Sequence, residues 1–84
     1  MISKQTVESL NLKNYTLKSC REMHQELSSK YKSISDLEFV LSQPHSDPEF
    51  LNKVWWVLNY HSDIMDNSRK LRALVESRLD HMAN

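Results

Sequence analysis

The stretch PEFLNKVWWVLNYHSDIMDNSRKLRALVESRLDHM, residues 48–82, decides the fold, because its apolar side chains recur every three or four residues. That spacing is typical of one face of an α-helix. Asp47, Pro48 and Glu49 provide a helix start: an aspartate cap, a proline at the first helical position and an acid near the positive end of the helix dipole. No glycine and no further proline follows. We therefore predict one long helix over residues 48–82.

A helix of this length would measure about 50 Å. A compact chain of 84 residues has a radius of gyration of only about 12 Å, so the helix would extend beyond the rest of the protein. We expect another chain to cover the overhanging part, so that the long helix mediates association. The alternative is a bend near residues 63–68, where Ser62 or Asp66 could cap a second helix.

The adjacent tryptophans lie on either side of the apolar stripe, because neighbouring helical residues point about 100° apart. We expect one ring to pack against the N-terminal helices and the other, Trp56, to lie at an interface, where tryptophan is a frequent anchor. His61 and Ser68 interrupt the stripe with polar groups, which could set the register of paired helices or, for the imidazole, respond to pH. The predicted partner interface consists of Trp56, Tyr60, Ile64, Leu71, Leu74 and Val75.

Two shorter helices are predicted at the start of the chain. Ser3 can cap a helix that runs to Leu10, and a second helix is expected from Tyr15 or Thr16 onward. The apolar side of this second helix is formed by Leu17, Cys20, Met23, Leu27 and Tyr31.

A third helix is predicted from a pair of local signals. The segment from Ser35 to Glu38 has the form of a capping box, and Ile34 and Phe39 occupy the positions of a hydrophobic staple. The helix should therefore start at Ser35. It should end by Gln43, because a residue before proline avoids helical geometry.

The chain is expected to be one all-α domain, residues 1–84. Short helices within residues 1–43 would pack on the long helix, and the proline-bracketed residues 44–48 would link the two parts. The absence of glycine supports this class, because hairpin turns commonly need positive φ angles. It also argues against glycine-rich nucleotide loops and the hydrolase nucleophile elbow.

The cysteine count, the apolar stretches and the net charge indicate the cellular compartment and the kind of partner. A single cysteine rules out an internal disulfide and suits a reducing compartment. No stretch approaches the roughly 20 apolar residues of a membrane span, and the first residues do not resemble a secretory signal. We expect a cytoplasmic protein without a membrane span. The net charge is zero, with basic ends around an acidic middle, which suits attraction within the chain or between subunits as well as it suits nucleic acid.

Metal and catalytic signals are weak. Cys20 and His24 are spaced so that both could face one site on a helix, but a structural zinc ion needs four ligands, usually in two close pairs. Only one such pair is present. No arrangement of nucleophile, base and backbone nest is recognisable in the sequence. We expect no metal, no cofactor, no small-molecule substrate and no enzymatic activity.

Residues 6–19, TVESLNLKNYTLKS, resemble the core of a helix-turn-helix DNA-binding unit. Leu10, Asn11 and Leu12 match the apolar–glycine–apolar turn of that family, with asparagine in place of glycine, and Thr16 and Leu17 match the start of its second helix. The resemblance implies that side chains at this second helix face phosphates or base edges in the major groove. These residues are Lys13, Asn14, Thr16, Lys18 and Ser19. The zero net charge argues against this function, since DNA-binding domains are usually basic.

The function expected from these features is non-catalytic protein–protein interaction through helix–helix contacts, as a homodimer or as a small regulator, adaptor or inhibitor of another protein. Small accessory proteins of bacteria and phages, such as lysis-timing or host-takeover proteins, offer an analogy at the level of class. The alternative is a helix-turn-helix transcriptional regulator that uses residues 6–19.

Overall fold

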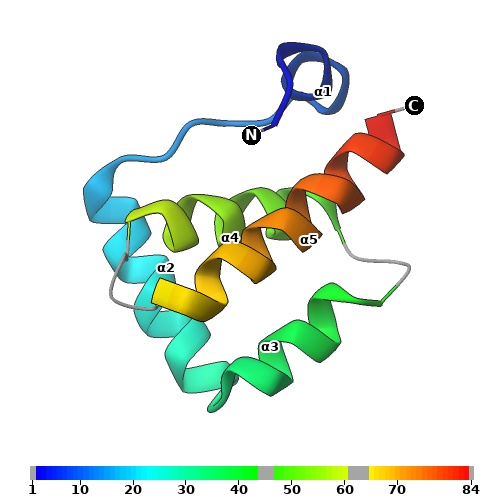
Figure 1. Ribbon diagram of the computed structural model, residues 1–84. Coiled ribbons are helices and arrows are strands. Elements are labelled where there is room, and N and C mark those ends of the chain that lie inside the picture. Colours follow the sequence, from blue (N-terminus) through cyan, green and yellow to red (C-terminus); the bar gives the residue numbers. More distant parts are fainter. Residues whose placement is uncertain (1, 44–46, 61–64, 84) are drawn as a thin grey trace.

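The computed structural model describes residues 2–43, 47–60 and 65–83, and residues 65–68 by their backbone alone. These described residues form five α-helices, joined by loops, and no strand. The helices are α1 (Lys4–Leu10), α2 (Leu17–Lys30), α3 (Ile34–Leu41), α4 (Pro48–Tyr60) and α5 (Met65–Ala83). They form a small bundle in which α5 packs against α1, α3 and α4, and α2 packs against α4 (Figure 1). The all-α bundle is confirmed.

The prediction of one long helix over residues 48–82 is wrong. The helix α4 ends at Tyr60, α5 begins at Met65, and the two pack against each other as an antiparallel pair. The capping role suggested for Ser62 falls outside the described residues. Folding back is favoured because it buries the two apolar stripes against each other, whereas a straight helix would leave them facing water. The radius of gyration is 12.0 Å, the value expected of a compact chain of this length.

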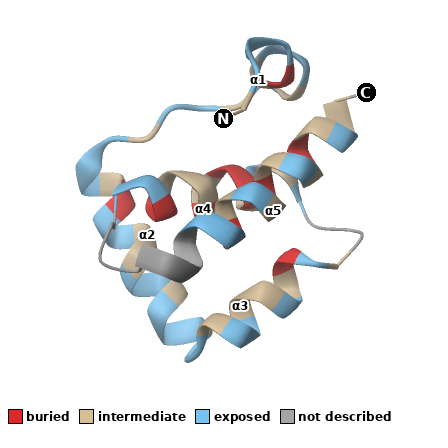
Figure 2. Cartoon of the chain, viewed as in Figure 1, coloured by how far each residue is buried: buried red, intermediate tan, exposed pale blue. Residues whose placement is uncertain are grey.

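The core lies where α4 and α5 cross, and Figure 2 shows buried positions gathered on these two helices. Helix α3 contributes one buried side chain and α2 another. The buried hydrophobic residues are Cys20, Leu41, Leu51, Val54, Val57, Leu58, Leu71, Val75 and Leu79.

Helix α1 begins and ends as predicted. The Ser3 hydroxyl caps it by accepting a 3.1 Å hydrogen bond from the Thr6 amide. At its other end Asn11 adopts the left-handed conformation, with φ of 51° and ψ of 49°, and the Leu12 amide donates to the Val7 carbonyl at 3.0 Å. This is a Schellman-type end, which asparagine can adopt where glycine is absent. The buried Thr6 then faces α5.

Helix α2 starts close to the predicted position, with Thr16 as its cap, but its predicted apolar side is only partly buried. The Thr16 hydroxyl accepts a 3.2 Å hydrogen bond from the Ser19 amide. Cys20 is fully buried, whereas Leu17, in the first turn, stays 45% exposed. Farther along, the Tyr31 ring lies 6.4 Å from Phe50 and helps to hold α2 on α4.

Helix α3 starts earlier than predicted, because Ser33 and not Ser35 is its cap. The Ser33 hydroxyl accepts a 3.2 Å hydrogen bond from the Asp36 amide. Starting here places Ile34 inside the helix, on the same face as Leu37, where both pack on the core. The staple to Phe39 is therefore wrong, and that ring is 69% exposed.

Candidate interaction surface

Three aromatic rings surround that of Trp56, two from the same helix, α4, and one from the segment before α2. The Trp56 ring centroid lies 5.5 Å from that of Trp55 at an interplanar angle of 81°, and 6.5 Å from that of Tyr15 at 74°. The Tyr60 ring stacks on it at 5.9 Å and 23°. Both edge-to-face and offset-stacked arrangements are favourable for aromatic pairs. We call Tyr15, Trp55, Trp56 and Tyr60 the aromatic cluster.

Helix α4 supplies three members of the aromatic cluster by its geometry. Trp56 and Tyr60 are four residues apart, so they lie on one side of the helix, one turn from each other. Trp56 is half-buried and Tyr60 is 43% exposed. The stack is therefore held on the outside of the bundle, with much of the tyrosine facing solvent.

Tyr15 reaches the cluster because a buried side chain fixes the segment before α2. The Asn52 amide, which is buried, donates a 2.8 Å hydrogen bond to the carbonyl oxygen of Lys13. This bond satisfies a polar group that would otherwise be costly to bury. It also holds Lys13 against α4, and two residues later the Tyr15 ring lies beside Trp56.

Trp55 is anchored to α5 and forms the base of the cluster. Its indole nitrogen donates a 2.9 Å hydrogen bond to a carboxylate oxygen of Glu76, and its ring packs against the core. Partial burial raises the pKa of the Glu76 carboxyl, but hydrogen bonding, in part from this indole, and the positive charge of Arg72 outweigh it and hold the pKa below its usual value. A second link joins Arg72 to Asn59 at 3.1 Å. The two pairs fix the register of α4 against α5.

The structure separates the predicted partner interface into three groups. Trp56 and Tyr60 lie together on the surface, and Leu74 is half-buried. Leu71 and Val75 are fully buried in the core of this chain, so their assignment to a partner surface is wrong. The apolar stripe that suggested it is covered by α4 instead. The remaining three assignments, Ile64, His61 and the side chain of Ser68, fall outside the described residues.

The predicted packing of the two tryptophan rings is also corrected. Trp55 packs on the core and on α5, whereas the expectation was that one ring would pack on the N-terminal helices. It is Trp56 that touches the N-terminal half, through Tyr15. Sequence reasoning missed Tyr15 as a surface residue, because a lone aromatic ring between two helices gives no periodic signal.

The helix-turn-helix arrangement of residues 6–19 is not formed. Both helices exist, but α1 packs on α5, and residues 12–16, which form neither helix nor turn, carry the chain away to α2 (Figure 1). The motif requires two helices packed together across a tight turn. Thr16 and Ser19 are engaged in capping α2, while Lys13, Asn14 and Lys18 are exposed.

The described residues show neither a metal-binding cluster nor a membrane-spanning helix. They contain no group of three or more His, Cys, Asp or Glu side chains placed to hold a metal ion. Within the same part of the chain, no helix combines the length and the apolar character needed to cross a bilayer. Comparison with protein-family models, with curated proteins and with solved structures gives no match for this chain.

Proposed function

We propose that this chain is a non-enzymatic protein-interaction module that binds its partner through the aromatic cluster around Trp56. The observation that carries the proposal is the Trp56–Tyr60 stack on the outside of the bundle. Tryptophan and tyrosine are the residues most enriched among those that dominate binding energy at interfaces. Such a surface suits a small regulator, adaptor or inhibitor.

The way the cluster is held supports this function. Trp55 is tied to Glu76, and Tyr15 is placed by Asn52, so the base and one side of the cluster are fixed before binding. Rings that are already held in place lose little conformational freedom when a partner covers them, which favours affinity. Tyr60 does not belong to the core, so its exposed ring would contribute hydrophobic free energy to binding when another molecule buries it.

The test compares Tyr60→Ala with Phe39→Ala. Both substitutions remove an exposed aromatic ring, but Phe39 lies on α3 and outside the aromatic cluster. Sedimentation at micromolar concentration measures self-association, and affinity capture from the native host measures binding to other proteins. Tyr60→Ala should weaken the observed complex by about tenfold or more, whereas Phe39→Ala should leave it unchanged. Equal binding by both variants would contradict the proposal.

A second candidate function is nucleic-acid binding, and one observation favours it. The exposed cations Lys13 and Lys18 flank Tyr15 in sequence, so basic and aromatic side chains occur together there. Anisotropy of a labelled generic duplex at low salt tests it, because phosphate contacts do not require a specific sequence. Lys13→Gln with Lys18→Gln should weaken binding, while Lys4→Gln with Lys70→Gln, which removes two exposed cations elsewhere, should weaken it less.

A further inference from the structure

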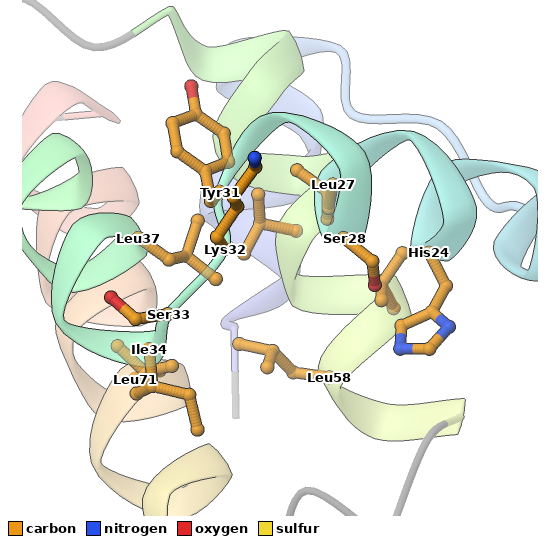
Figure 3. A pocket seen from close by; sticks show the side chains of 12 residues that line it. His24, Leu27, Ser28, Tyr31, Lys32, Ser33, Ile34, Leu37, Leu58 and Leu71 are labelled. Atoms are coloured by element: carbon orange, nitrogen blue, oxygen red, sulfur yellow. The ribbon is translucent and has the colours of Figure 1, made fainter.

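A cavity of about 180 Å³ lies on a different part of the molecule from the aromatic cluster. Its lining comes from the second half of α2, the segment leading into α3, and side chains of α4 and α5 (Figure 3). The inner walls are aliphatic, and Figure 3 shows Leu27, Leu37, Leu58 and Leu71 arranged around the central space. An engineered apolar cavity of about 150 Å³ is large enough to take benzene.

The apolar walls of this cavity come from two parts of the fold. Leu58 and Leu71 are buried in the core where α4 and α5 pack, so this side is fixed by the bundle itself. Ile34 and Leu37 belong to α3, which packs mainly on α5. Apolar pockets with a few polar groups at one end are the common form of small-molecule sites. The cavity therefore combines an apolar wall from the core of α4 and α5 with apolar side chains of α3.

The rim of the cavity is polar and positively charged. Among the described residues that line it, Lys32 is the one that carries a full charge, and none of them is acidic. Ser28 and Ser33 contribute hydroxyl groups from two sides of the cavity, and the His24 imidazole lies on the α2 side near Ser28 (Figure 3). The Ser33 oxygen accepts from the Asp36 amide, which leaves its O–H free to donate. These groups are suited to a carboxylate.

We propose that this cavity binds a small carboxylate with an apolar body the size of one aromatic ring or a branched aliphatic chain. The apolar body lies between Leu37 and Leu58, and the carboxylate lies at the rim, near Lys32 and the Ser28 hydroxyl. The shape of the apolar walls thus recognises the body of the ligand, and the charge of Lys32 recognises its carboxylate. The proposal does not depend on the proposed function, because none of the aromatic cluster lines the cavity.

Three probes that share one ring separate apolar from electrostatic recognition: phenylacetate, phenylacetamide and phenethylamine. Titration is followed by methyl and amide chemical shifts. We expect phenylacetate to bind best, phenylacetamide more weakly and phenethylamine least, with the largest shifts at Leu37, Leu58 and Leu71. Absence of binding at millimolar concentration would overturn the proposal. So would shifts centred on Trp56.

Matched variants test the two parts of the site. Ser28→Phe places a ring in the mouth of the cavity from an exposed position of α2, and should abolish binding of phenylacetate. Ser29→Phe adds the same ring one residue away, where it does not line the cavity, and should leave binding intact. If both variants bind equally, the cavity is not the site.

A second pair of variants tests the charge. Lys32→Gln should weaken phenylacetate about two- to fivefold, the range of a solvent-exposed ion pair, and leave phenylacetamide unchanged. Lys18→Gln removes an exposed cation of α2 that does not line the cavity, and is the control. Equal loss for both probes in Lys32→Gln would show that Lys32 is not the carboxylate partner.

Discussion

The hydroxyl of Thr6 donates a 2.6 Å hydrogen bond to the carboxylate of Asp80 and so joins two residues that are 74 positions apart. The same hydroxyl lies 2.8 Å from that of Ser3, the cap of α1. One buried threonine thus links the start of α1 to the last turns of α5. This link holds α1 on the bundle together with the apolar contacts of Ile2 and Leu10.

Replacing Thr6 should release α1 from α5. Thr6→Val keeps the shape of the side chain but leaves Asp80 without its donor, which should lower the free energy of unfolding by about 1.5 kcal/mol. Denaturant unfolding measures the loss, and hydrogen exchange should show faster opening of α1 than of α4. Thr6→Ser retains the hydroxyl and is the matched control. A fully protected α1 in Thr6→Val would contradict this role.

Asn52 should control the aromatic cluster from a distance. Asn52→Ala removes the bond to the Lys13 carbonyl, so we expect Tyr15 to leave Trp56 and the stability to fall by about 1–2 kcal/mol. Nuclear Overhauser contacts between the two rings report the change directly. The control is Gln25→Ala, which removes an amide side chain from an exposed position of α2, away from the aromatic cluster. Contacts that persist in Asn52→Ala would show that another group places Tyr15.

Stability should depend on pH through Glu76. Its pKa is lower in the folded chain than its ordinary value, so its contribution to stability is present above the unfolded-state pKa and is lost as the pH falls through the folded-state pKa. The stability gap between the wild type and Glu76→Gln should therefore be largest near neutral pH and shrink below about pH 4. Denaturant unfolding over pH 3–7 measures it, with Glu22→Gln as the control for charge at an exposed site. A gap that does not change with pH would be the contrary result.

The start of α3 can be tested with two neighbouring serines. Ser33→Ala should cost about 1 kcal/mol, because it leaves the Asp36 amide without its capping acceptor. Ser35→Ala should cost little, because Ser35 is an exposed residue within the helix, where alanine is favourable. Thermal or denaturant unfolding of both variants is sufficient. A larger loss of stability in Ser35→Ala than in Ser33→Ala would support Ser35 as the cap, as predicted from the sequence.

Local chemistry made much of this fold predictable. Caps at Ser3, Thr16 and Asp47 identify helix starts, because each depends only on a side chain and an amide two or three residues away. The left-handed Asn11 is equally local. The fold-back between α4 and α5 was not chosen from the sequence, since the helical periodicity continues across residues 48–82 and no proline or glycine marks a break.

The candidate site was predictable only in part for a related reason. Periodicity shows that a stripe is buried but not which surface covers it, so Leu71 and Val75 were assigned to a partner when α4 covers them. Trp56 and Tyr60 were identified because large rings to the side of the stripe have no place in a narrow core. Tyr15 could not be found in this way, because its position depends on a contact between Asn52 and Lys13 that is distant in sequence.

The antiparallel pairing of α4 with α5 has a consequence for the order of folding. Its cross-links, Trp55 to Glu76 and Asn59 to Arg72, each close a short length of chain, whereas the bond from Thr6 to Asp80 spans nearly all of it. Short closures lose less entropy and form sooner. We therefore expect the α4–α5 hairpin to form early and α1 to dock last, which makes this first helix the latest part of the chain to reach its native place.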